Sequence, residues 1–257
     1  LSTINPRLVY CAISAFGQEG PWRDKPGVDG VVQAMSGLMS VTGTEEGPPV
    51  KVDVPAADMV GGFLAATGIL LALLARERTG RGQRVDVALL DALLAFQTVP
   101  LAMYLSSGEP PKRMGSAAPY AAPNEAFPTK DGYIMVAAYS PQRWGKLCEV
   151  LGSPALAEDP RFHTNEARVR NRRALQEVLA PLFRQRTTEE WVRILEEADI
   201  LCGPILAYPE LLSHPQVRAN AMIVQLFHPA LGTAASAGIP IKLTQTPGTV
   251  RHPPPLP

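Results

Sequence analysis

The chain has 257 residues, and its 24 lysines and arginines balance 24 aspartates and glutamates, so the formal net charge is zero. It is 46% hydrophobic and 19% charged, a composition typical of a soluble globular protein with a sizeable core. The neutral balance argues against a nucleic acid or an anionic membrane as a partner bound by bulk charge.

Cysteine and histidine are sparse in this chain. The three cysteines, Cys11, Cys148 and Cys202, form no C-x-x-C pair, which is typical of reduced thiols. The four histidines are scattered, and no two have the spacing of metal ligands. We therefore expect a cytoplasmic protein without a metal site.

The first half of the chain alternates strand and helix patterns. We expect strands at 7–14 and 83–87, an extended piece at 50–54, and helices at 28–39 and 88–105. The most hydrophobic run, 59–75, follows Asp58 and is shorter than the about 20 residues of a membrane span. It therefore predicts a buried helix, which ends at a glycine C-cap near Gly80.

After Ser107 the composition changes to a stretch rich in proline and breaks, 108–124, which we interpret as a functional loop and linker. The pattern beyond it predicts strands at 133–138 and 222–228, helices at 142–151, 172–185 and 188–198, and a short helix at 217–221. The helix at 188–198 begins with a capping signature, Thr187 followed by Glu190.

Asp58 is the leading candidate for a catalytic residue. It stands at the mouth of an apolar helix, where a carboxylate can cap free backbone N–H groups and interact with the helix dipole. Position alone fits a plain N-cap. The alternative is a carboxylate nucleophile that forms covalent acyl intermediates and so divides one difficult step into two.

A central group of motifs joins Pro-x-x-Asp58 to the segment 76–87 and to Leu89-Leu-Asp-Ala92. Further motifs stand at 4–10, 16–21, 26–29, 33–39, 127–132 and Arg161-Phe162. In this order, over nearly the whole chain, these motifs resemble the family III CoA-transferases, the formyl-CoA and carnitine/bile-acid type.

This resemblance implies a specific reaction. An aspartate at the position of Asp58 attacks the donor acyl-CoA, passes through a mixed anhydride and an aspartyl-CoA thioester, and hands CoA to a small organic (di)carboxylic acid. Backbone N–H groups at the helix start would stabilise the oxyanions. No permanently bound cofactor is expected, because coenzyme A and acyl-CoA are substrates.

The resemblance also implies roles for residues before the helix at 28–39. Asp29 would be a second catalytic residue near the nucleophile, although it also suits the N-cap of that helix. The residues that would line the CoA pantetheine or phosphates are Lys25, Pro26, Gly27 and Val28. A solvated lysine is the plain alternative for Lys25.

Two further segments are open to more than one interpretation. Gly115 and Ser116 fall where relatives have a loop that closes over the aspartyl intermediate, and a plain linker is the alternative. Four arginines at 168–173 suggest a solvated basic face or a contact with the CoA 3′-phosphate. We expect Trp144 and Trp191 to pack in the core.

Two other functions remain open. An α-methylacyl-CoA racemase shares the fold and the aspartate, but such relatives carry a histidine where this chain has Val28, as the second acid–base group. The chain is alternatively a catalytically silent fragment or binding subunit. Family members are expected to have an N-terminal Rossmann-like segment and a closing segment after the position of Pro257, and we expect that this chain lacks both.

The expected fold is α/β, with a partial Rossmann-like large domain and a smaller α+β domain. Residues 1–115 would be the middle part of the large CoA-binding domain with the nucleophile. Residues 116–212 would be the linker loop and small domain, and 213–257 would return toward the large domain. By resemblance we expect a homodimer of interlocked chains.

Overall fold

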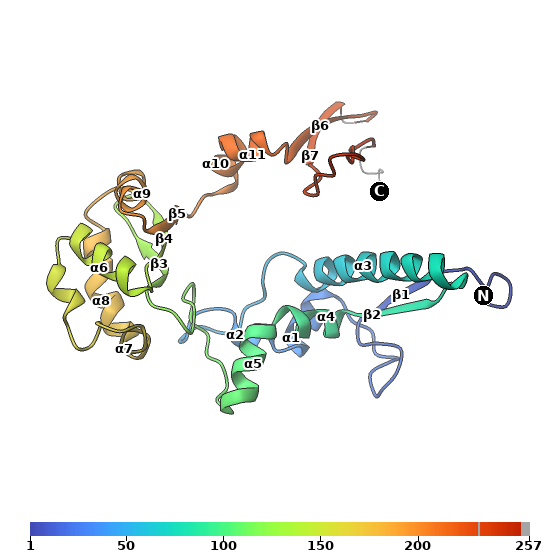
Figure 1. The fold of residues 1–257 in the computed structure, drawn as a ribbon, viewed down its shortest axis with the longest axis horizontal. Coiled ribbons are helices and arrows are strands. Elements are labelled where there is room, and N and C mark those ends of the chain that lie inside the picture. The colour runs from blue at the N-terminus through green and yellow to red at the C-terminus, as the bar shows by residue number, and fades with distance from the viewer. Residues whose placement is uncertain (231, 253–257) are drawn as a thin grey trace. The chain divides into compact units, whose positions relative to one another are not determined.

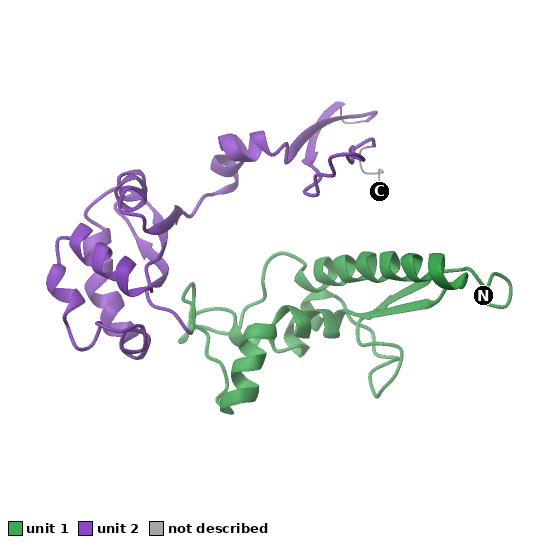
Figure 2. Cartoon of the chain, in the orientation of Figure 1, with its two compact units in different colours: residues 1–119 green, residues 120–257 purple. Residues whose placement is uncertain are grey.

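A computed structural model describes residues 1–230 and 232–252 of the chain (Figure 1). The chain divides into two compact units, unit 1 at 1–119 and unit 2 at 120–257 (Figure 2). Both units combine helices with strands, which confirms the predicted α/β class. The roles predicted for 1–115, 116–212 and 213–257 stay predictions.

Unit 1 is built around a pair of parallel strands. Its elements are β1 (Tyr10–Ser14), α1 (Asp29–Met35), α2 (Leu38–Val41), α3 (Ala56–Thr79), β2 (Arg84–Ala88), α4 (Leu89–Phe96) and α5 (Thr98–Ser107). In the register of the two strands, Tyr10 lies opposite Arg84 and Ser14 lies opposite Ala88. Parallel pairing requires a long crossover, which the helices α1 to α3 supply.

Two of the expected helices are each divided in two. The helix expected at 28–39 breaks at Gly37, whose φ of 85° lies in the left-handed region that favours glycine. The helix expected at 88–105 bends by 73° between α4 and α5, where Gln97 stands at the break. The apolar pattern crossed both breaks, so hydrophobic periodicity alone did not reveal them.

Helix α3 is longer than the hydrophobic run that predicted it. It begins at Ala56 after Pro55, and it ends at Gly80, whose φ of 73° confirms the predicted glycine C-cap. Proline suits a helix start because it has no N–H to leave unpaired and its φ is already near the helical value.

The expectation that α3 is a buried helix holds only for one side of it. Its buried residues after the first turn are small, namely Gly61, Ala65 and Ala72. The large side chains of Phe63 and Leu70 are 64% and 61% exposed. By length and composition α3 could cross a membrane, a property that core helices of soluble proteins share.

The core of unit 1 gathers the start of α3 with α1, α2 and α4. Its buried members are Phe16, Val32, Leu38, Ala56, Ala57 and Leu93. Ala57 is completely buried. Apolar packing therefore fixes the first turn of α3, which also carries Asp58.

Unit 2 contains an antiparallel three-stranded sheet with helices. Its elements are β3 (Asn124–Pro128), β4 (Tyr133–Ala137), α6 (Pro141–Val150), the 3₁₀ turn η1 (Pro154–Ala157), α7 (Asn165–Arg170), α8 (Arg172–Phe183), α9 (Thr188–Glu197), β5 (Leu201–Pro204), α10 (Tyr208–Ser213), α11 (Pro215–Ala219), β6 (Ile223–His228) and β7 (Gly232–Ala237). The sheet order is β3-β4-β5, and β6 pairs with β7 as a hairpin.

Several aromatic side chains pack together in the core of unit 2. Trp144 and Trp191 are 2% and 3% exposed, which confirms their predicted core positions. Phe183 stacks on Phe127 with 4.7 Å between ring centroids and meets Trp191 edge to face at 5.2 Å. The capping box between Thr187 and Glu190 is also present, as predicted.

Two of the arginines expected on a solvated face are buried instead. Arg168 is completely buried and donates to the carbonyl oxygens of Ala122, Phe162 and Tyr139 at 2.6–2.8 Å. Burial lowers the pKa of its guanidinium to about 10. Arg172 donates to Glu125 at 2.8 Å, and burial raises the pKa of that carboxyl group. Buried charges need partners, and the partners of both arginines come from other segments of the unit. Both arginines therefore stabilise the fold by joining these segments.

Candidate functional site

Asp58 is the third residue of α3 and lies in its first turn. Because Pro55 is the N-cap, Asp58 is not the N-cap residue that its sequence position suggested. The side chain is exposed. Among residues 1–230 and 232–252, no hydrogen bond or ion pair reaches its carboxylate. Asp58 therefore presents an open carboxylate at the positive end of a 24-residue helix.

The backbone N–H groups of this helix start are not all occupied. The N–H of Ala56 donates to the carbonyl of Val54 at 2.7 Å, and that of Ala57 donates to Oδ1 of Asp29 at 2.8 Å. The N–H of Asp58 has no acceptor in the part of the chain that the structure describes. A backbone donor is therefore free beside the candidate nucleophile.

Asp29 is brought to the same helix start as Asp58, although it begins a different helix, α1. Its Oδ1 accepts from the Ala57 N–H, and its Oδ2 accepts from Nε2 of Gln33 at 2.7 Å. Asp29 does not cap its own helix, as its sequence position suggested, because the N-cap of α1 is Val28. It caps α3 across the unit instead.

Gln33 was not singled out by the sequence analysis. Its side chain is completely buried. Its Oε1 accepts from the Val52 N–H at 2.9 Å, and its Nε2 donates to the Val52 carbonyl at 3.2 Å as well as to Asp29. The local signal was the i,i+4 spacing of Asp29 and Gln33, which places both side chains on one face of a helix.

Lys25 lies beside two aromatic rings in the loop before α1. Its Nζ is 5.3 Å from the ring centroid of Trp22 and 5.8 Å from that of Phe16. The two rings contact each other edge to face at 5.5 Å. The ammonium group of Lys25 is thus held at the surface by cation–π contacts rather than by a carboxylate.

The other residues predicted to line the CoA site complete the same loop. Pro26 is exposed, and Val28 is 69% exposed. A Cβ added to Gly27 would lie 2.7 Å from Cβ of Ala15, so the backbone of Gly27 lies too close to the residue after β1 for a side chain to fit without a shift. Gly27 therefore brings this loop close to the end of β1, two residues before Asp29.

The candidate lid residues belong to a loop that is tied to a second loop of unit 1. The N–H of Gly115 donates to the carbonyl of Gly43 at 2.8 Å, and Gly115 has a φ of 62°. Arg113 donates to the carbonyl of Gly47 at 2.8 Å. Ser116, the other predicted lid residue, is exposed.

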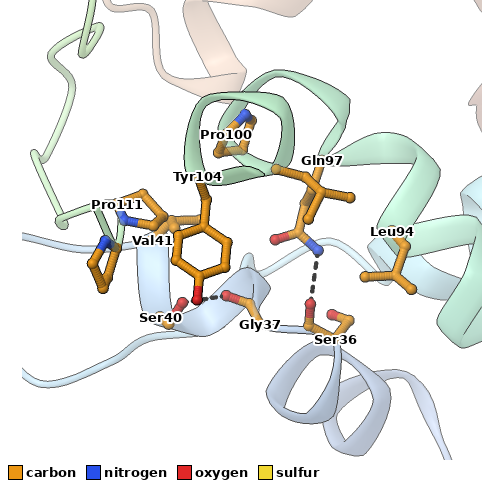
Figure 3. A pocket seen from close by; sticks show the side chains of 11 residues that line it. Ser36, Gly37, Ser40, Val41, Leu94, Gln97, Pro100, Tyr104 and Pro111 are labelled. Carbon is orange, nitrogen blue, oxygen red and sulfur yellow. Dashed lines mark hydrogen bonds between the residues drawn. The ribbon is translucent and has the colours of Figure 1, made fainter. Parts of the chain in front are cut away.

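A pocket of about 270 Å³ opens between α1–α2 and α4–α5 (Figure 3). Its walls are largely apolar and include Leu94, Pro100 and Leu101. Gln97 closes one side by donating to the Ser36 carbonyl at 3.1 Å. The pocket is lined by neither Asp58 nor Asp29. In the described part of the chain, no three His, Cys, Asp or Glu side chains are grouped to hold a metal ion.

Comparison with known proteins identifies the relatives of this chain. The model of CoA-transferase family III matches residues 1–257. Among curated proteins, the chain is 35% identical over 256 residues to the succinyl-CoA:glutarate CoA-transferase of Mus musculus. It is 37% identical over 245 residues to the acetyl-CoA:oxalate CoA-transferase of Acetobacter aceti. The first alignment covers 100% of the chain and the second 95%.

Solved structures of similar proteins share the fold of this chain. A CAIB/BAIF family protein from Brucella suis has a TM-score of 0.82 at 35% identity, covering 96% of this chain and 64% of that one. Rv3272 from M. tuberculosis has a TM-score of 0.86 at 30% identity, covering 97% and 66%. The chain spans 59% of the mouse protein and 62% of the Acetobacter protein. The chain belongs to CoA-transferase family III.

Proposed function

We propose that this chain carries the nucleophile of a CoA-transferase that moves coenzyme A between an acyl-CoA donor and a small dicarboxylic acid. The observation that carries the proposal is the situation of Asp58, an exposed carboxylate beside a free backbone N–H on the first turn of α3. The substrate class follows from the relatives, whose names specify succinyl-CoA with glutarate and acetyl-CoA with oxalate.

The proposed reaction exchanges carboxylates across one thioester. The Asp58 carboxylate attacks the donor thioester carbonyl, and CoA thiolate leaves to give a mixed anhydride. The thiolate then attacks the Asp58 carbonyl carbon, which releases the donor acid and forms an aspartyl-CoA thioester. The acceptor carboxylate reverses the two steps and regenerates Asp58. No net proton transfer is required, and the Asp58 N–H is a donor for the oxyanions.

Other parts of the proposal concern binding and assembly. Lys25 to Val28 would hold the pantetheine or phosphates of CoA, since Lys25 offers an ammonium group without a carboxylate partner in the described residues. Gly115 and Ser116 would form the lid over the aspartyl intermediate. We also infer a homodimer and a cytoplasmic location, the latter supported by three free cysteines.

The racemase alternative is less well supported by the same loop. Two-base racemisation needs a second acid–base group at the α-carbon. The position before Asp29 holds Val28, whose side chain cannot transfer a proton. Asp29 itself already accepts two hydrogen bonds.

Trapping of the intermediate tests the proposal. The purified protein is incubated with succinyl-CoA and treated with hydroxylamine or borohydride, and the adduct is located by peptide mass spectrometry. We expect modification at Asp58, no adduct in Asp58→Ala, and an unchanged adduct in Glu77→Gln. Glu77 is a matched control because it is an exposed acid at the opposite end of α3.

The other functions predict different outcomes. Deuterium exchange at the α-carbon of a branched acyl-CoA without any adduct would identify a racemase. Absence of both signals, together with no binding of CoA, would leave the catalytically silent fragment. Either result contradicts the proposed transfer.

A further inference from the structure

A buried glutamine connects the start of α3 to the helix before it. Gln33 is completely buried, yet both polar atoms of its amide have partners. Its Oε1 and Nε2 bind the backbone N–H and carbonyl of Val52 at 2.9 and 3.2 Å. Nε2 also lies 3.4 Å from the Val54 carbonyl. The segment that leads into α3 is therefore hydrogen-bonded to α1 through one side chain.

The same amide fixes the carboxylate that caps α3. Nε2 of Gln33 donates to Oδ2 of Asp29 at 2.7 Å, and Oδ1 of Asp29 accepts from the Ala57 N–H at 2.8 Å. The contacts thus run without a gap from Gln33 through Asp29 to Ala57, the residue before Asp58. Hydrogen bonds to a charged group are stronger than neutral ones, so this path resists displacement.

We propose that Gln33 is a positioning residue for the reaction of Asp58. It acts through two contacts, the backbone at 52–54 and the Asp29 carboxylate, which together fix where α3 begins and how its first turn faces. Asp29 has the same positioning role, since one of its carboxylate oxygens accepts from Gln33 and the other accepts from the Ala57 N–H of that turn. The inference rests on the proposed function, because it concerns the chemistry assigned to Asp58.

The chemistry of the Gln33 site offers a specific test. In Gln33→Glu, a protonated carboxyl group can still accept from Val52 and donate to Asp29, whereas an ionised one would place two carboxylates in contact. Burial and a like charge both raise the pKa of an introduced acid. Among described residues Asp29 is the charged group bonded to Gln33, and the neighbouring Lys51 and Asp53 are exposed. In Gln33→Met, neither bond forms at any pH.

We expect kcat of Gln33→Glu to fall about tenfold or more at about pH 8 and to recover to within roughly threefold of wild type at about pH 5.5. Gln33→Met should stay low at both pH values. The KM for succinyl-CoA should change less than about twofold in both variants, because the contacts position the nucleophile and not the substrate. Each variant is first shown to be folded by circular dichroism.

Gln97→Glu is the matched control. Gln97 is also buried in unit 1 and binds backbone carbonyls, those of Ser36 and Leu93, but within the described residues it makes no hydrogen bond to the start of α3. The melting temperature of the Gln97→Glu variant should vary with pH, whereas its kcat relative to wild type should not recover when the pH is lowered to about 5.5. Full kcat in folded Gln33→Met, a loss confined to KM, or equal acid rescue in Gln97→Glu would overturn the inference.

Amide hydrogen exchange separates this inference from the proposed function. The Ala57 amide, which Asp29 protects, should exchange faster in Gln33→Met than in wild type while amides in the middle of α3 are unchanged. Unchanged protection at Ala57 would refute the positioning role whatever the activity. Wild-type protein that forms no Asp58 adduct would instead refute the proposed function, and the exchange result would still stand.

Discussion

Asp29 and Asp58 have the same side chain but opposite surroundings. Both oxygens of Asp29 accept hydrogen bonds, from Gln33 and from the Ala57 backbone, so its electron pairs are engaged. The carboxylate of Asp58 is exposed, and nothing in the described residues binds it. A nucleophile needs free electron pairs and access to substrate, whereas a capping group needs fixed partners. This contrast favours Asp58 as the reacting group.

Gly27→Ala tests the loop that is proposed to hold CoA. The added Cβ would lie 2.7 Å from Cβ of Ala15 and 3.1 Å from the Phe16 ring, so the loop or the residues after β1 must shift. We expect a loss of about 1–3 kcal/mol in the free energy of unfolding, measured by urea denaturation, and a raised KM for acyl-CoA. Gly30→Ala, with nothing within 4 Å of its added Cβ, should be neutral or stabilising. Equal stability of the two variants would contradict the close approach.

At the level of elements, α3 depends on small residues where it meets the strands. Gly68 faces β2 so closely that an added Cβ would lie 2.7 Å from Cγ1 of Val85. Gly62 of the same helix has nothing within 4 Å of such an atom. One glycine therefore serves packing, while the other carries only the entropic cost of glycine in a helix.

Gly68→Leu should consequently force α3 away from β2. We expect a loss of roughly 1–3 kcal/mol or more in the free energy of unfolding, with a lower melting temperature. Gly62→Ala should gain up to about 1 kcal/mol, because alanine has the higher helix propensity. Calorimetry on both variants measures the difference, and a melting temperature of Gly68→Leu at or above wild type would show that α3 does not pack on β2 this way.

Local signals in the sequence predicted the elements better than their breaks and pairings. The glycine end of α3 at Gly80 and the capping box at Thr187 depend on neighbouring residues, so the sequence alone could reveal them. The bend at Gln97 has a local signal, because Pro100 has no N–H to donate to the Phe96 carbonyl and so interrupts the helix. The bond from Gln97 to Ser36, 61 residues away, has no such local signal. Strand β3 begins at Asn124, where the stretch interpreted as loop ends, and the sequence analysis missed it because its proline and polar residues mask a short, half-buried strand.

The candidate site shows the same division. Asp58 and Asp29 could be named from motif order, whereas their connection could not. Asp29 contacts Ala57 across 28 residues, and Gln33 contacts Val52 across 19. Such contacts depend on how α1 packs against the start of α3, which is a tertiary property. Buried Arg168 was misjudged for the same reason, since its three carbonyl partners come from separate segments.

At the scale of the whole molecule, the net charge is zero, so the protein does not attract an anionic ligand through its overall charge. Recognition of CoA would therefore depend on local groups such as Lys25, and because Lys25 is exposed its attraction for CoA phosphates should weaken as salt is added. The two units have separate cores, one around Phe16 and Leu93 and the other around Trp144 and Trp191. A probe in each unit can thus follow its opening independently.

The three cysteines supply such probes, because Cys11 lies in unit 1 and the other two lie in unit 2. Burial raises the pKa of Cys148 to about 12 and that of Cys202 to about 11, from an ordinary value of 9.0. At about pH 8 the thiolate fraction of Cys202 should be about 100-fold lower than that of a cysteine with the ordinary pKa, and that of Cys148 should be lower still. We therefore expect iodoacetamide to alkylate both at least about 100-fold more slowly in native protein than in urea.

Mass spectrometry of tryptic peptides measures these rates, and each rate in urea is the internal control for its own cysteine. The same shifts make stability fall as the pH rises above 9.0, because the unfolded chain then releases the thiol protons before the folded chain does. Cys148→Ala should remove much of this alkaline loss, although the emptied volume costs some stability at neutral pH. Native-state alkylation of Cys148 as fast as in urea would show that the core of unit 2 is open to solvent, and the packing around Trp144 would have to be rejected.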